Sequence, residues 1–104
     1  MSFDIEGTIG DMTSAISAVI SDEWPGVEGC VKKALDDEKD ALADIAKARI
    51  DGEIDDEDLI SQIEDEKVAL EAAMLACNVK AKIMAQNAAN SAMDVLKEAI
   101  KVVL

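Results

Sequence analysis

The chain has 104 residues, no histidine and a formal net charge of −13. This is the length of a single domain, 1–104, and the charge repels nucleic acid and anionic membrane surfaces, which both need Lys and Arg patches. Half of the residues are hydrophobic, but seventeen of these are Ala and only Phe3 and Trp24 are aromatic. An Ala-rich set of apolar residues favours close helix packing and makes self-association an expectation.

Two helices are predicted before the midpoint of the chain. Thr8 precedes an apolar series at helical spacing, which predicts a helix over roughly 8–22. The Trp-Pro-Gly segment at 24–26 interrupts it, because the residue before Pro leaves the α region, and Pro suits the start of a second helix over about 25–50. The second helix ends at the Asp-Gly pair 51–52, where Gly accepts a left-handed conformation.

The third predicted helix is long, because no Gly or Pro occurs from Asp56 to the C-terminus. Asp55 can cap its start, and a helix over 56–103 would be about 70 Å long. The predicted fold is therefore all-α. It is a helical hairpin with a short N-terminal helix and a long C-terminal helix, and copies of it assemble into an intermolecular helical bundle.

Self-assembly is predicted from the middle of this third helix. Between Val68 and Val79 only Glu71 and Asn78 are polar, so the helix must be covered from more than one side. A second copy of the chain is the simplest cover, which predicts a homodimer or a higher oligomer. The residues expected at its interface are Leu70, Met74, Leu75, Val79, Ile83 and Met93.

Acidic residues are concentrated in one region. Fifteen of the twenty-three lie between Asp36 and Glu71, together with only four basic residues. This pattern predicts an acidic surface for a basic protein or a cation. We expect it to be formed by Asp51, Glu53, Asp55, Asp56, Glu57 and Asp58. Residues 51–58 resemble the second half of an EF-hand calcium loop, but Lys47 and Arg49 stand where the leading ligands belong. We therefore expect a capped helix corner there.

A second pair of acids interrupts apolar stripes. In an antiparallel hairpin about the 51–55 turn, residues whose numbers sum to roughly 105 lie level, so Glu38 faces Glu66 or Lys67. Two facing carboxylates need a proton, a Lys or a metal between them. One hypothesis is a cation site formed by Glu38 and Glu66. The other is that both carboxylates reach Lys39, Lys67 or solvent, as ordinary residues at a helix margin do.

Catalysis is not expected. The chain has no His, no Tyr and no Gly-rich phosphate loop, and its serines lack a recognisable base. Cys30 and Cys77 are not a CxxC pair, and we expect both to be buried free thiols. No cofactor is expected. The first seven residues lack the features of a secretory signal, and no run approaches about twenty apolar residues, which together predict a cytoplasmic protein.

Three functions are compatible with these patterns. The first is a non-enzymatic structural or protein-interaction module that forms homo-oligomers through Ala-rich helix faces and presents an acidic pole. The second is an acidic inhibitor that imitates nucleic acid and binds a basic protein. The third is a small helical bundle that binds a cation through Glu38 and Glu66.

Overall fold

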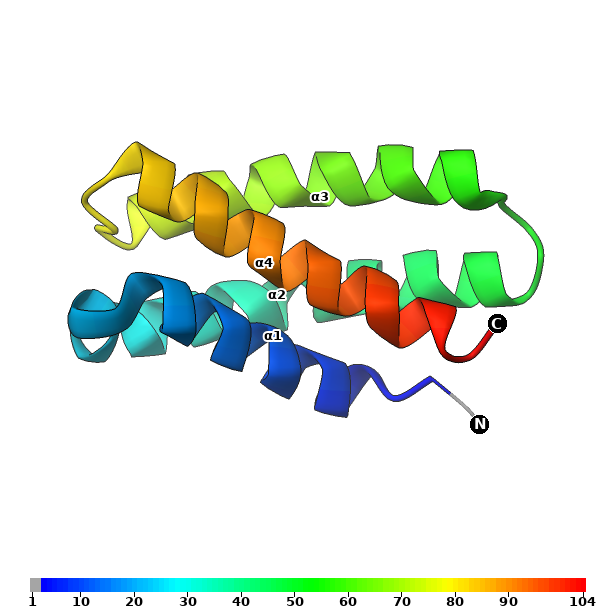
Figure 1. Ribbon diagram of the computed structural model, residues 1–104, viewed down its shortest axis with the longest axis horizontal. Coiled ribbons are helices and arrows are strands. Elements are labelled where there is room, and N and C mark those ends of the chain that lie inside the picture. The colour runs from blue at the N-terminus through cyan, green and yellow to red at the C-terminus, as the bar shows by residue number, and fades with distance from the viewer. Residues whose placement is uncertain (1–2) are drawn as a thin grey trace.

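The computed structural model describes residues 3–104 and is an up-down-up-down bundle of four α-helices (Figure 1). The four helices are joined by short connections, one of which is the 3₁₀ helix η1. The elements are α1 (Ile5–Ile20), η1 (Ser21–Glu23), α2 (Trp24–Ile50), α3 (Asp56–Ala76) and α4 (Lys82–Lys101). The all-α prediction is confirmed, and the described residues contain no strand.

Each helix packs beside two others. α1 contacts α2 and α4, and α3 contacts α2 and α4, with the α1–α4 pair in the most extensive contact. The turn between α2 and α3 lies at the same end of the bundle as the C-terminus and the start of α1, whereas η1 and the α3–α4 connection lie at the opposite end (Figure 1). The bundle measures 39 × 23 × 19 Å.

The predicted turn between the second and third helices is confirmed. Gly52 has a φ of +80°, the left-handed conformation that Gly adopts without steric penalty. Asp55 then forms a capping box with Asp58. The Asp58 N–H donates to Asp55 Oδ1 at 2.8 Å, and the Asp55 N–H donates to Asp58 Oδ2 at 3.5 Å. These bonds satisfy two backbone donors that the start of a helix leaves unpaired.

The first predicted boundary is shifted by one turn. α1 begins at Ile5, three residues before the expected start. Thr8 is buried inside the helix instead of capping it, and its hydroxyl donates to the Asp4 carbonyl oxygen at 2.7 Å. A threonine that bonds the carbonyl four residues earlier is compatible with helix interior, so its presence does not mark a helix start.

The prediction of one helix over 56–103 is wrong, because α3 ends at Ala76. Asn78 adopts a φ of +72°, and its N–H donates to the Leu75 carbonyl at 3.1 Å, while the Val79 N–H donates to the Met74 carbonyl at 3.1 Å. This pair of bonds is a Schellman motif, in which Asn takes the position usually held by Gly. The chain therefore reverses, and α4 returns along the bundle.

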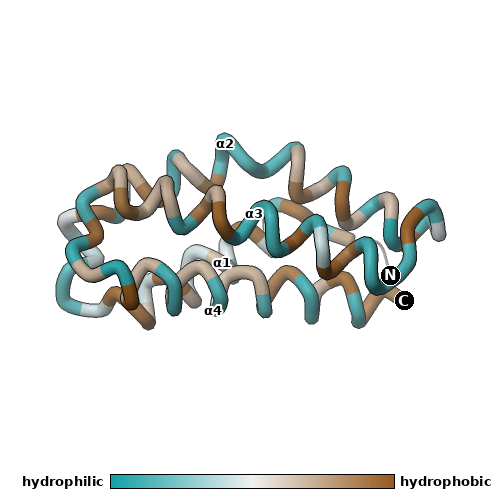
Figure 2. The backbone as a smooth tube through the Cα atoms, turned by 90° about the horizontal axis from the view of Figure 1, so that it is seen from above, coloured by the Kyte–Doolittle hydropathy of each residue, from teal (hydrophilic) through white to brown (hydrophobic). Residues whose placement is uncertain are grey.

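This reversal lets the chain cover its own apolar faces. Four alanines of α4 are fully buried, namely Ala85, Ala88, Ala89 and Ala92. Small side chains allow close approach of two helices, as between α1 and α4. Figure 2 shows hydrophobic and hydrophilic residues interspersed along every helix, as expected for amphipathic helices around one core.

Candidate functional site

The hairpin of α2 and α3 brings the two predicted carboxylates together. Glu38 lies on α2 and Glu66 on α3, and both are partly buried. Burial and, to a smaller extent, the charge of Glu66 together raise the pKa of Glu38 from 4.5 to about 7. The predicted register, in which residue numbers sum to roughly 105, therefore places the correct pair side by side.

Glu38 receives no compensation from the neighbouring lysines. Its Oε2 atom is buried and has no hydrogen-bond partner within residues 3–104. Lys39 donates instead to Glu6 on α1 at 2.9 Å, and Lys67 donates to Glu64 at 2.7 Å. The hypothesis that Lys39 and Lys67 neutralise the pair is therefore not supported, and a proton on Glu38 is the remaining compensation near neutral pH.

A cation site at this pair lacks ligands. Residues 3–104 contain no group of three or more His, Cys, Asp or Glu side chains placed to hold a metal ion. Hard cations such as Ca²⁺ take six to eight oxygen ligands, and Mg²⁺ takes six. Glu38 and Glu66 supply two carboxylates at most, so the pair is better described as a protonation site than as a metal centre.

The predicted acidic surface lies at one end of the bundle. All six of its residues are exposed: Asp51, Glu53, Asp55, Asp56, Glu57 and Asp58. Three of them have local structural roles, since Asp55 and Asp58 cap α3 and Asp56 accepts a hydrogen bond from Arg49 Nε at 2.7 Å. No ion pair forms at Asp51, Glu53 or Glu57 within the described part of the chain.

Most of the predicted interface residues belong to the core of the chain itself. Four of the six are buried: Leu70, Met74, Val79 and Met93. They were assigned to a dimer interface because a straight third helix leaves them uncovered, and the reversal at Asn78 removes that reason. Leu75 and Ile83 remain exposed, by 38% and 63%.

The prediction of two free thiols is wrong, because Cys30 and Cys77 form a disulfide. The bond joins α2 to the residue that caps the end of α3, across a sequence separation of 47. The hairpin register contained the signal for this pairing: a sum of 105 places Cys30 level with residue 75, only two positions from Cys77.

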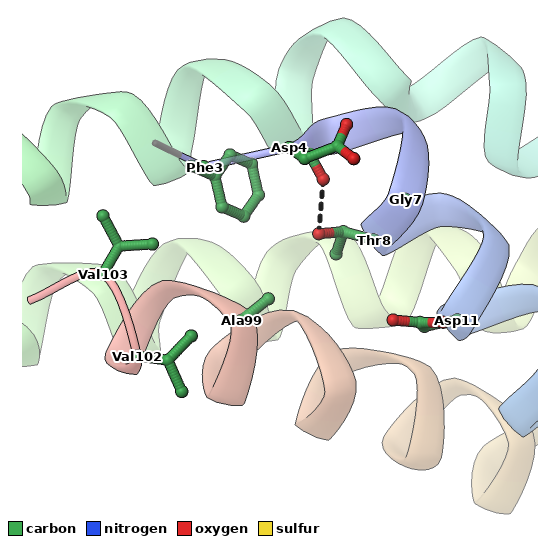
Figure 3. A pocket seen from close by; sticks show the side chains of 8 residues that line it. All are labelled: Phe3, Asp4, Gly7, Thr8, Asp11, Ala99, Val102 and Val103. Atoms are coloured by element: carbon green, nitrogen blue, oxygen red, sulfur yellow. Dashed lines mark hydrogen bonds between the residues drawn. The ribbon is translucent and has the colours of Figure 1, made fainter. Parts of the chain in front are cut away.

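An open pocket of about 300 Å³ lies between the start of α1 and the end of α4 (Figure 3). It is lined by Phe3, Asp4, Gly7, Thr8, Asp11, Ala99, Val102 and Val103. The Thr8 hydroxyl is engaged by the Asp4 carbonyl, as the dashed line in Figure 3 shows. The lining offers two carboxylates, the engaged Thr8 hydroxyl and apolar groups.

Comparison with known proteins gives no assignment, since no family model, curated protein or solved structure matches the chain. Within residues 3–104, no helix combines the length and apolar character needed to cross a membrane. The physical properties of the surface are therefore the basis for a functional proposal.

Proposed function

We propose that the protein is a non-enzymatic interaction module, a disulfide-linked helical bundle that presents an acidic face to a basic protein. One observation carries the proposal. The turn and α3, residues 51–76, contain ten acidic residues and one basic residue, a net charge of −9, whereas the adjacent α4 contains three basic residues and two acidic ones. Solubility alone needs no such separation of charge between neighbouring helices.

The local uses of these acids do not account for their number. Capping of α3 and the Arg49–Asp56 and Lys67–Glu64 ion pairs involve four acidic residues. The other acids on the turn and α3 repel one another, which destabilises the folded chain unless a cationic surface approaches. A basic protein supplies that charge, and a groove that otherwise binds nucleic acid is one surface of this type.

The disulfide favours an oxidising compartment, whereas the sequence patterns predict the cytoplasm. Disulfides persist in oxidising compartments and are rare in cytosolic proteins of mesophiles. The Cys30–Cys77 bond therefore favours an oxidising environment over the cytoplasm as the place where this module binds its partner.

Self-association is a second candidate, supported by the exposed apolar side chains that remain. Leu75 and Ile83 are the two predicted interface residues that a second copy can still reach. Two highly acidic chains repel each other, so an interface between copies must avoid the acidic faces. Light scattering at increasing salt distinguishes this candidate, because screening strengthens contact between like-charged copies and weakens binding of a basic partner.

The proposal is tested with a short Lys- and Arg-rich peptide and two variants that each remove three negative charges. The first variant replaces Asp51 with Asn, and Glu53 and Glu57 with Gln, and keeps the capping residues. The matched control makes the corresponding changes on α1 and α4, at Asp11, Asp94 and Glu98. We expect the first variant to weaken peptide binding at least tenfold more than the control, with the difference shrinking as salt rises. Equal weakening by both variants would show that peptide binding depends on the overall net charge and not on the acidic face.

A further inference from the structure

The outward face of α3 carries three large apolar side chains that the rest of residues 3–104 leaves exposed or partly exposed. Ile60, Val68 and Leu75 are 53%, 60% and 38% exposed. At 100° per residue they fall within an arc of about 80° and span about 22 Å along the helix axis. The buried residues of α3, among them Ile63 and Leu70, lie on the adjacent side of the helix, about 110° from the centre of this arc. We call Ile60, Val68 and Leu75 the α3 stripe.

Exposed carboxylates accompany the α3 stripe along its length. Glu57 and Glu64 project from the same side of the helix, and Asp58 and Asp65 border it on one flank. The only basic residue of α3, Lys67, is already paired with Glu64 at 2.7 Å. The carboxylates of Glu57 and Glu64 therefore alternate with the apolar side chains along this face, and Asp58 and Asp65 add negative charge on one flank.

One end of the stripe opens into a groove between α3 and α4. The groove has a volume of about 320 Å³ and includes Ile60 among its lining residues, with Leu59, Ile100 and Leu104 as further apolar walls. Concave apolar sites of this type hold the anchoring side chains of a binding partner. The groove gives the stripe a place where one large apolar side chain of a partner can be buried.

We propose that the α3 stripe is the docking site for an amphipathic helix of the partner, one whose apolar residues are flanked by Lys and Arg. The inference rests on the proposed function and adds the conformation and chemistry of the ligand. Apolar side chains repeating every seven or eight residues along a straight helix match the apolar face of a second helix laid beside it. Lys and Arg next to the apolar residues of that helix then meet Glu64, which lies between the apolar side chains of the α3 stripe, and Asp65 on its flank.

Charge decides between this occupant and a second copy of the chain. Pairing two α3 stripes places two helices of net charge −6 in contact, and like charges across an interface disfavour association. A basic helix gains from the same carboxylates. An anionic membrane surface is excluded as well, because its negative charge would be repelled by the same carboxylates.

The lysines at the groove end restrict how the helix lies. Lys97 and Lys101 line the groove beside Asp56, so the groove itself disfavours a Lys or Arg side chain of the partner. The C-terminus of a helix carries partial negative charge and is stabilised near cations. The partner helix therefore lies with its C-terminal end at Lys97 and Lys101 and its basic residues along the middle of α3.

The test uses two synthetic peptides of identical composition. One forms an amphipathic helix with a Leu stripe flanked by Lys, and the other has the same residues in an order that abolishes the stripe. Binding of each is measured by calorimetry to the full chain and to the variant Val68→Ser/Leu75→Ser. The control is Ile83→Ser/Val102→Ser, which replaces two exposed apolar side chains, 63% and 67%, outside the α3 stripe.

We expect the amphipathic peptide to bind at least tenfold more tightly than the reordered one, and the α3 variant to lose that advantage, about tenfold for each apolar side chain removed. The control variant should still bind the amphipathic peptide more tightly than the reordered one. If the α3 variant binds the amphipathic peptide as tightly as the original chain does, the proposed docking site on the α3 stripe is wrong. The proposal that the acidic face binds a basic protein is then unaffected. If neither peptide binds, the proposed function fails as well. If the α3 variant converts a dimer into a monomer in the absence of peptide, the occupant is a second copy and the inference is overturned.

Discussion

The two helical pairs of the bundle, α1–α4 and α2–α3, differ in their net charge and in the interactions that stabilise them. The α1–α4 pair has a net charge of −1 and makes the most extensive helix contact in the bundle, and four alanines of α4 are fully buried. The α2–α3 hairpin, residues 24–76, has a net charge of −10, contains the disulfide partner Cys30 and holds the uncompensated carboxylate of Glu38. The first pair supplies stability by packing, and the second retains charge at the expense of stability and relies on a covalent bond at one end.

Removal of the disulfide is expected to have the largest effect. Replacing Cys30 and Cys77 with Ser lowers the free energy of unfolding by about 4 kcal/mol, because the bond closes a loop of 47 residues in the unfolded chain. Urea unfolding with and without reductant measures the change. The reductant should leave the double variant unaffected, and an original chain equally stable in both conditions would show that packing alone holds the hairpin.

The α1–α4 contact can be broken by adding volume. Ala88→Leu inserts a large side chain at a fully buried position and is expected to destabilise the protein by about 1–3 kcal/mol through overpacking. Ala72→Leu adds the same volume at an exposed position of α3 and should change stability by less than about 0.5 kcal/mol. Thermal unfolding of the two variants compares them, and equal effects would contradict the close packing described for α4.

Glu38 makes the stability of the hairpin depend on pH. Its folded pKa of about 7 lies above the unfolded value near 4.5, so the folded chain binds more protons between these values and stability falls as pH rises through this window. The full shift corresponds to about 3 kcal/mol, which solvent screening of a half-buried group reduces to about 1–2 kcal/mol.

Glu38→Gln should remove this fall and raise the free energy of unfolding at about pH 8 by about 1–2 kcal/mol, with little change at about pH 4. Urea unfolding at both pH values measures it, and Asp37→Asn, at an exposed neighbouring position, is the control. A variant that keeps the pH dependence of the original chain would assign the effect to the exposed acids instead.

The turn between α3 and α4 should give the smallest effect. Asn78→Ala places a side chain without local hydrogen-bonding capacity at a φ of +72° and is expected to destabilise the protein by about 1 kcal/mol. Asn78→Gly should be neutral or slightly stabilising at the same site. Chemical unfolding measures the stability of both variants. If Asn78→Gly is destabilising, the Asn side chain contributes to stability beyond allowing the left-handed backbone conformation.

Much of the hairpin could be predicted from the sequence, because its signals are local. Gly52 and the pair Asp55 and Asp58 encode the turn and the cap within a few residues. The helical period and the turn position then fix the register that brings Glu38 to Glu66. The start of α2 is predicted to within one residue, because Pro25 fits the first turn of a helix. The expectation that the residue before Pro leaves the α region is wrong: Trp24 is α-helical, with φ −54° and ψ −47°, and the break lies at Ser21, whose φ is +57°.

Only the tertiary structure decided where the second half of the chain goes. Asn78 is compatible with a helix interior and with a left-handed turn, and the difference is decided by burial of Val79 and by the packing of α4 on α1. The disulfide likewise depends on a Cα–Cα distance of 5.7 Å between Cys30 and Cys77, which exists once the hairpin has formed. The sequence by itself determined the helices and the acidic hairpin, whereas the cover for each apolar face depended on contacts between distant segments that no local pattern encodes.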